Sequence, residues 1–296
     1  MDFLTIYIPS YNRGDLLIKQ LEMISRSMFL ENINVIVSDN NSNDPKYEEI
    51  KKFCLENFFT YIKNNFNDTG NPNIFNGFLY SFKSEYLWIL SDNDLILDST
   101  VDKVYEILKK NDLDLFLLAH NSYENFVVKN INQEKLLNDL IIKSSGLGLI
   151  SNVIYKSNFI KDNIYIGYDF IFSWFPHLSV LIKSFYNKSG KVGIINKSKF
   201  FEDEEKGYVK NNKYYYSRSY YGFVFLAELF EQKNKIRFIK NYSGFWNLRH
   251  WFFYKKAPNV FFNEILAYGY LSRYDFLFKF KLLIWKFIYL FLNNKE

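Results

Sequence analysis

Short apolar runs alternate with segments of helical periodicity along the first two thirds of the chain. Residues 3–8, FLTIYI, form an apolar run with β-branched members, and Pro9 ends it. Apolar residues then recur at helical spacing from Leu17 to Met28, and residues 33–37, INVIV, form a second run. Apolar runs this short, separated by a helix, predict a parallel βαβ unit with a right-handed crossover.

The alternation continues to about residue 200. Asp15 is expected to cap the first helix. The pattern as a whole predicts an α/β fold with a doubly wound, mostly parallel sheet that binds ligands at the carboxyl ends of its strands. No GxGxxG and no Walker A motif is present, which removes the main support for dinucleotide and P-loop sites. Further helices are predicted over 46–57, 74–83, 101–108 and 175–186, and further strands over 58–63, 86–90, 113–119 and 192–196.

Charge is divided unevenly along the chain. The net charge is +5, but residues 206–296 hold 16 Lys or Arg against 5 Asp or Glu, while residues 1–205 hold 21 against 27. Aromatic and basic residues interleave in the last third, as in YYYSRSYYGF over 214–223. We therefore predict a catalytic domain over 1–200 and a helical, basic and aromatic C-terminal extension over 201–296.

The segment 274–292, YDFLFKFKLLIWKFIYLFL, has the composition of an interfacial helix. Lys279 and Lys286 are seven residues apart on one helical face, and Trp285 and Tyr289 are side chains typical of membrane interfaces. The lysines interrupt each apolar run, which favours a helix lying in the headgroup region over one that spans. The alternative is a helix packed on the catalytic domain or on a dimer partner.

The cysteine content and the first residues narrow the class of protein. The single cysteine, Cys54, excludes a disulfide framework and a cysteine-based zinc site. The sequence MDFLTIYIPSYNR lacks the pattern of a secretory signal, and no long uncharged apolar stretch follows. We expect a cytoplasmic protein attached peripherally to the inner face of the cell membrane.

Two carboxylates follow the predicted strand 86–90. In the sequence Asp92-Asn93-Asp94 they are one residue apart at a strand end, where both can point into the crevice above the sheet. Oxygen ligands of this kind suit Mg²⁺ or Mn²⁺, which share their coordination between a few carboxylates and substrate phosphates. The alternative is a polar turn in which Asp and Asn bond their own backbone.

Three segments occur in an informative order: IYIPSYNR (6–13), VIVSDNNSND (35–44) and NGFLYSFKSEYLWILSDND (76–94). Over roughly residues 3–200 the chain resembles the family 2 glycosyltransferases of the GT-A fold, of the bacterial surface-polysaccharide type. The resemblance implies an inverting transfer of a sugar from a nucleotide-sugar donor, most commonly a UDP-sugar, with Mn²⁺ or Mg²⁺. The implied acceptor is a cell-surface glycan or lipid-linked oligosaccharide, as in lipopolysaccharide or capsule synthesis.

The same resemblance assigns roles at the donor site. Asp39 is expected to contact the base, and Asn40 stands where the family usually has a second Asp, which leaves the base preference open because an amide donates as well as accepts. Arg13 is either a donor contact or an ordinary surface charge. The implied donor set is Pro9, Tyr11, Asn12, Arg13, Asp39, Asn40, Asp92 and Asn93, and the implied metal ligands are Asp92 and Asp94.

The catalytic base is less clear, because the family usually has an acidic residue where a late helix opens. Pro176-His177 occupies that place, and a histidine with a pKa near 6.5 suits a base at neutral pH. A packed or capping imidazole is the alternative for His177. Asp169 is the second candidate and the acidic run EDEE over 202–205 is the third. Residues 144–156 resemble the stretch that lines the acceptor, with Gly148 and Ser151 near the sugar.

Two other classes of function remain open. A nucleotidyltransferase acting on sugar phosphates shares the sheet and a metal-binding Asp, but IPSYNRGD carries only one Arg and one Gly for a triphosphate loop. A non-catalytic membrane or nucleic-acid module fits the basic aromatic segment but leaves the Asp pair without a role. Neither a nucleic-acid partner nor a particular oligomeric state is predicted.

Overall fold

The computed structural model describes residues 2–119, 124–136, 140, 147–173, 175–186, 188–202, 226–230 and 234–235. By packing, residues 1–171 and 176–205 form one compact unit, and residues 172–175 and 206–296 belong to a second. The predicted interfacial segment 274–292 lies outside the described residues, as do most of the predicted extension and residues 203–205 of the acidic run. The domain boundary at residue 200 stays a prediction.

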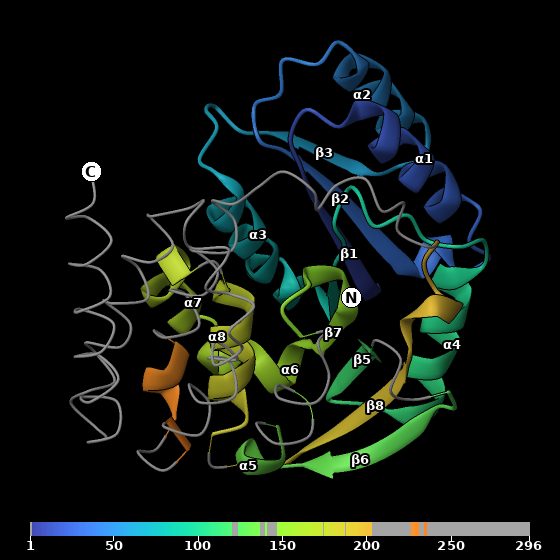
Figure 1. The fold of residues 1–296 in the computed structure, drawn as a ribbon. Helices are drawn as coiled ribbons and strands as arrows, with labels where there is room; N and C mark the ends of the chain where they lie inside the picture. The colour runs from blue at the N-terminus through green and yellow to red at the C-terminus, as the bar shows by residue number, and fades with distance from the viewer. Residues whose placement is uncertain are drawn as a thin grey trace, which may run out of the picture. The chain divides into compact units, whose positions relative to one another are not determined.

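A mixed, mostly parallel sheet forms the centre of the first unit (Figure 1). Within the described residues its order is β3-β2-β1-β4-β7-β5-β8-β6. The neighbours from β3 to β4 are parallel, as are β5 and β8, whereas β7 runs antiparallel between β4 and β5 and β6 runs antiparallel beside β8. The strands are β1 (Asp2–Ser10), β2 (Ile33–Asp39), β3 (Thr60–Lys63), β4 (Ser84–Ile89), β5 (Leu115–Ala119), β6 (Val127–Ile131), β7 (Val153–Lys156) and β8 (Gly190–Asn196).

Helices cover both faces of this sheet, which confirms the predicted α/β class. In Figure 1, α1, α2 and α4 lie on one face, and α3, α6 and α8 lie on the other. The helices of the unit are α1 (Gly14–Ser25), α2 (Lys46–Glu56), α3 (Gly70–Leu79), α4 (Thr100–Asn111), α5 (Gln133–Lys135), α6 (Ser157–Ile160), α7 (Ile166–Asp169) and α8 (Pro176–Ser184).

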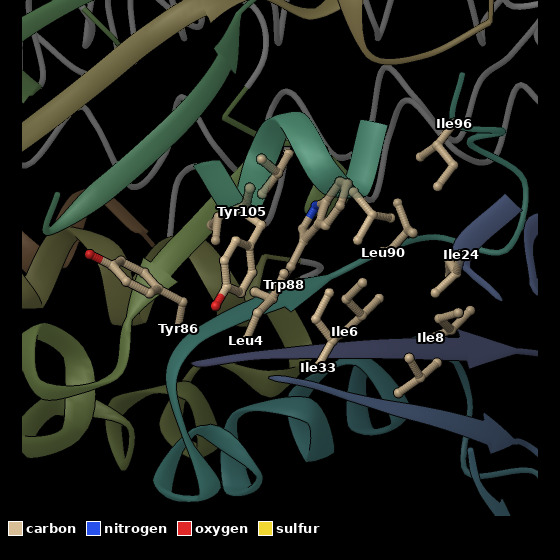
Figure 2. Packing of buried hydrophobic residues seen from close by; sticks show 14 of the residues in the cluster. Leu4, Ile6, Ile8, Ile24, Ile33, Tyr86, Trp88, Leu90, Ile96 and Tyr105 are labelled. Atoms are coloured by element: carbon tan, nitrogen blue, oxygen red, sulfur yellow. The ribbon is translucent and has the colours of Figure 1, made fainter. Parts of the chain in front are cut away.

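Alternate side chains of β1 divide between the two faces. Leu4, Ile6 and Ile8 join the apolar cluster under α1, α2 and α4, and Figure 2 shows Leu4 beside Trp88 of β4 and Ile8 towards Ile24 of α1. Tyr7 points to the opposite face, where a side chain added at Gly77 of α3 would touch its ring. Successive residues of a strand face opposite sides of the sheet. The run FLTIYI is apolar throughout because helices cover both of these sides.

The first helix is capped differently from the prediction. It begins at Gly14, one residue before Asp15, and Asp15 lies in its first turn without a capping bond. The cap is Asp44, whose Oδ2 accepts from the Gly14 N–H at 2.9 Å. A Cβ at position 14 would lie 2.7 Å from that same oxygen, so glycine lets the Asp44 carboxylate reach the helix end. The capping residue follows the second strand. The spacing of residues along the first helix therefore could not reveal it.

Candidate active site

Asp92 lies where the carboxyl ends of β1 and β4 meet. Its side chain is only 2 % exposed. Its Oδ2 accepts from Ser10 Oγ at 2.7 Å, and its Oδ1 forms an ion pair with Arg13 Nη1 at 2.6 Å. A buried carboxylate needs such partners because the loss of hydration would otherwise be costly. Both Asp92 oxygens are therefore engaged, and Arg13 is more than an ordinary surface charge.

Asp94 lies two residues further on and is only half-buried. Its Oδ2 accepts from Ser151 Oγ at 2.5 Å, and the same hydroxyl oxygen accepts from the Ser91 N–H at 2.9 Å. Ser151 thus contacts the turn that carries the two aspartates. Asn93, between them, is exposed and bonds through Oδ1 to the Ser91 hydroxyl. The arrangement holds the Asp94 carboxylate at the sheet edge.

Two side chains that the sequence did not single out hold this edge together. Gln20 of α1 is fully buried; its Nε2 donates to Asp94 O and its Oε1 accepts from Ile96 N–H, both at 3.1 Å. Tyr47 of α2 places its hydroxyl 2.5 Å from Ser10 Oγ. Gln20 was detectable in principle, since it is an amide on the apolar face of a predicted helix. Tyr47 gave no comparable signal, because a buried aromatic is ordinary.

One of these carboxylates is more accessible to a divalent cation than the other. No group of three or more His, Cys, Asp or Glu that could hold a metal occurs within the described ranges. Mg²⁺ and Mn²⁺ commonly use one or two carboxylates and complete their coordination with water and substrate phosphates, so a small ligand set is compatible with them. Ser10 and Arg13 occupy the two Asp92 oxygens. Asp92 and Asp94 both stay predicted metal ligands, and Asp94 is the more accessible of the two to an ion.

Asp39 and Asn40 lie at the end of β2 and face inward. Asp39 is fully buried, with Oδ1 accepting from the Ser42 N–H at 2.8 Å and Oδ2 from the Tyr61 hydroxyl at 2.7 Å. Burial and, to a smaller extent, the hydrogen bond to Asp39 raise the pKa of the Tyr61 hydroxyl. This hydroxyl therefore stays a neutral donor. Both Asp39 oxygens are engaged inside the protein. This geometry favours a role in shaping the turn after β2 over the predicted contact with the base.

The turn after β1 is tied to the turn after β2. Asn12 has a left-handed backbone, with φ of 52°; its N–H donates to Ser42 Oγ at 3.0 Å and its Oδ1 accepts from Asn43 N–H at 2.9 Å. Pro9 is half-buried in β1, whereas Tyr11 is 41 % exposed. Of the predicted donor residues in this turn, Tyr11 and Asn12 are therefore exposed, and Arg13 is half-buried.

His177 is buried in α8 and is 2 % exposed. Its Nε2 donates to the Gly148 carbonyl at 3.2 Å, and burial lowers its pKa to about 4. A general base must contact the acceptor hydroxyl from which it removes the proton. The enclosed ring does not fit that role. The geometry instead favours the packed imidazole, which holds the segment containing Gly148.

The buried His177 predicts a specific loss of stability in acid. Its pKa is about 4 in the folded chain and about 6.5 in the unfolded chain, so the unfolded state binds more protons between these values. The stabilisation is complete above pH 6.5 and is lost as the pH falls towards 4, by on the order of 1–3 kcal/mol. We expect His177→Gln to unfold with a smaller drop in urea midpoint from pH 7 to pH 5. The carboxylates contribute the same drop to both proteins. Equal drops would therefore mean that His177 contributes nothing, which would contradict the prediction.

Asp169 is exposed at the end of α7, and α7 is packed closely against α3. The Tyr168 ring meets Phe75 at 4.3 Å between centroids, and a Cβ at Gly167 would lie 2.1 Å from the Phe75 ring. Asn71, in the first turn of α3, donates to Ile171 O at 2.8 Å. Asp169 is therefore held beside the amino-terminal turn of α3, with its carboxylate in solvent.

The third candidate base segment starts beside the aspartate turn. The Glu202 N–H donates to Leu95 O at 2.9 Å, and Phe201 forms an isolated bridge with Ile96. The Glu202 side chain is exposed. The sequence gave no sign that this segment packs along the residues after Asp94.

Two comparisons with known proteins match part of the chain. The family model described as Glycosyl transferase family 2 matches residues 5–170. The curated protein "Glycosyltransferase GlyG" of Streptococcus pneumoniae is 22 % identical over 146 residues, which are 48 % of this chain and 48 % of that protein. The chain thus matches about half the length of this curated relative.

Solved structures share the fold at low sequence identity. S. aureus TarS 1–349 in complex with UDP-GlcNAc superposes with a TM-score of 0.64 at 13 % identity, covering 92 % of this chain and 82 % of that one. The mannosyltransferase PcManGT of Pyrobaculum calidifontis, in complex with GDP-Man and Mn²⁺, gives 0.51 at 12 % identity, covering 96 % and 84 %. Since the family match spans more than half of the chain, the protein belongs to glycosyl transferase family 2, and its fold is GT-A-like.

Proposed function

We propose that this protein is a glycosyltransferase that moves a sugar from a UDP-sugar to a cell-surface glycan or lipid-linked oligosaccharide, with inversion and with a divalent cation. The observation that carries the proposal is the polar cluster of Ser10, Arg13 and Asp92 with Asp94 beside it, at the carboxyl ends of β1 and β4. In doubly wound sheets this edge is where ligands bind. The UDP-GlcNAc of the TarS complex and the GDP-Man and Mn²⁺ of the PcManGT complex support a nucleotide-sugar donor and a metal.

Asp94 is proposed to bind the metal ion at the donor diphosphate, and Arg13 to add positive charge beside it. Mn²⁺ or Mg²⁺, held by Asp94, would neutralise the charge that develops on the leaving diphosphate. Ser151 orients the Asp94 carboxylate through its hydroxyl. Arg13 keeps 34 % of its side chain exposed while it pairs with Asp92, so its guanidinium adds positive charge at the same edge. Arg13 and Asp92 then fix the shape of the site, and Asp94 binds the ion.

Asp169 is proposed as the base that removes the acceptor proton. It is exposed, the neighbouring Tyr168 ring packs on Phe75 of α3, and the loop before α3 reaches the end of β2. A carboxylate can act as a general base and accept the proton of an acceptor hydroxyl. In an inverting transfer that hydroxyl attacks the sugar from the side opposite the diphosphate. His177 is proposed to support the acceptor side by holding Gly148.

A membrane-bound acceptor accounts for the composition of the last third of the chain. The lysine-punctuated aromatic segment 274–292 is proposed to lie in the headgroup region at the inner face of the membrane, where lipid-carried glycans are built. Among the helices that the structure describes, none is both long and apolar enough to cross a membrane.

A thermal-shift screen tests the donor proposal. A ligand that binds only the native state raises its stability, by about 2.7 kcal/mol at one hundred times its Kd. We expect a UDP-sugar to raise the melting temperature with Mn²⁺ present and a chelator to abolish the rise. GDP-, ADP- and CMP-sugars serve as matched controls.

The screen also separates the alternatives. A shift with a nucleoside triphosphate and a sugar phosphate, but with no nucleotide sugar, would favour the nucleotidyltransferase. No shift with any nucleotide sugar in the presence of Mn²⁺ or Mg²⁺ would overturn the proposed donor.

A further inference from the structure

The side chain of Asn40 binds four residues of a single loop. This loop, residues 64–69, joins β3 to α3. Asn40 Nδ2 donates to Asn67 Oδ1 at 2.9 Å and to Thr69 O at 3.0 Å. Asn40 Oδ1 accepts from Asn64 Nδ2 at 3.1 Å and from the Asp68 N–H at 3.2 Å. The buried amide therefore uses both of its donors and both acceptor positions on the same loop.

Backbone partners fix the orientation of this amide. The Thr69 carbonyl can only accept and the Asp68 N–H can only donate, so Nδ2 must face the first and Oδ1 the second. An ionised carboxylate at position 40 would offer acceptors alone. It would leave the Thr69 carbonyl without its donor and would face another oxygen there. The Asn that departs from the family pattern is thus the side chain that this loop requires.

The loop held by Asn40 has features that need such an anchor. Thr69 has φ of 75°, a left-handed value that is unfavourable for a β-branched residue. Asp68 Oδ1 is buried without a hydrogen-bond partner among the described residues, and burial raises the pKa of this carboxyl. Both features cost free energy, so the loop keeps this shape only if its surroundings impose it.

The two ends of the loop are also fixed. Asn64 N–H donates to Asp39 O at 2.8 Å at the end of β2. In α3, Asn73 is buried and bonds to Ser38 of β2 in both directions, at 2.6 Å and 3.1 Å. The middle of the loop carries Phe66, which is 67 % exposed. Asn40 is the contact that joins this middle part to the sheet edge.

We infer that Asn40 is a positioning residue for the donor nucleotide, acting through loop 64–69 and not by touching the nucleotide. The inference rests on the proposed function, since that function places a nucleotide sugar at the carboxyl ends of β1, β2 and β4. The loop follows β3, the strand next to β2, and so forms the wall of that edge on the β3 side. A loop held in one shape is ready to receive the nucleoside without an ordering cost on binding.

Asn40→Asp tests this inference, with Asn65→Asp as the matched control. Asn65 is exposed in the same loop, so its variant adds the same charge without removing the two bonds that the Asn40 amide donates. We expect Asn40→Asp to raise the donor KM about 10- to 100-fold, because a buried acceptor loses its partner. The kcat should change by less than about threefold, because the reacting groups are untouched. Simple destabilisation would lower the active fraction and leave the KM unchanged.

The pH dependence gives a second readout. The charged groups next to position 40 are Asp39, Asp68 in the loop, and Lys63, which pairs with Asp39 in the sheet register. Burial and the two carboxylates favour the protonated form of the carboxyl introduced by Asn40→Asp, and Lys63 opposes this more weakly because it is exposed. A protonated carboxyl can again donate to Thr69 O. The KM defect should therefore be smaller at pH 6 than at pH 8.

Amide hydrogen exchange at Thr69 completes the test. The Thr69 N–H donates to Asn67 Oδ1, which loses its bond from the Asn40 amide, so its protection should fall in Asn40→Asp and persist in Asn65→Asp. Donor binding by wild type together with an unchanged KM in Asn40→Asp would overturn the inference and leave the proposed function standing. A wild-type protein that binds no nucleotide sugar would overturn both. A KM defect of the same size in Asn65→Asp would also overturn it, because the added charge would then be sufficient to cause the effect.

Discussion

Asp94→Ala is expected to reduce sugar transfer by about 10³-fold or more, the equivalent of several kcal/mol of charge stabilisation by the metal. The side chain is half-buried at the end of β4 and is oriented by Ser151. Removing the carboxylate removes the proposed ligand, so donor binding should also lose its response to Mn²⁺. Transfer assayed against Mn²⁺ concentration, with thermal shift for donor binding, measures both effects.

Asp98→Ala is the control for Asp94→Ala. Asp98 is exposed four residues further along and its removal takes away the same charge. We expect it to transfer sugar at close to the wild-type rate. Asp94→Asn, which keeps the size and the bond to Ser151 but loses the charge, should be severely impaired and should recover partly at high Mn²⁺. Full Mn²⁺-dependent turnover by Asp94→Ala would remove the metal assignment.

Asp169→Asn is expected to lower transfer by about 10²–10⁴-fold, the range for loss of a general base. The amide has nearly the same shape but cannot take up the acceptor proton. Donor binding should be unchanged, because the base faces the acceptor. Single-turnover transfer, together with donor-induced thermal shift, separates the chemical step from binding.

Asp162→Asn provides the comparison for Asp169→Asn, because Asp162 is an exposed carboxylate a few residues earlier. It should retain transfer. An unaffected Asp169→Asn enzyme would exclude Asp169 as the base. Glu202, whose N–H donates to Leu95 O beside the aspartate turn, would then be the next residue to test. A large loss in His177→Gln without any loss of stability would restore the imidazole as the base.

The parallel strands β1, β2 and β4 were predictable because they are covered on both faces. Such strands are continuous apolar runs, and FLTIYI and YLWIL stand out for that reason. The strands β6 and β7 were not predicted. Val128, Lys129 and Asn130 of β6 are exposed, and β7 is only four residues long. Strands with such exposed or brief patterns become recognisable only through their partners β8, β4 and β5.

The sequence predicted only part of the site, as it predicted only part of the sheet. The aspartates after β4 were found because carboxylates that directly follow a buried strand fall at the sheet edge where ligands bind. The sequence did not reveal that Arg13 would pair with Asp92, or that Asn40 would bind four residues of one loop. Both depend on turns that meet only after the strands pair. His177 was singled out by position along the chain, and its burial depends on how α8 packs.

The antiparallel strand β7 determines when β4 and β5 can be joined into one sheet during folding. The strands β1 to β4 pair with neighbours made early in the chain, but β4 and β5 are joined only through β7, residues Val153–Lys156. Until that segment docks, each of these two strands has an open, largely apolar edge that can pair with another chain. Closure of such distant pairs is slow because a long loop must be ordered first. A nascent or truncated chain that stops before residue 153 therefore leaves one edge of β4 and both edges of β5 open, because β8, the other neighbour of β5, also comes later in the chain.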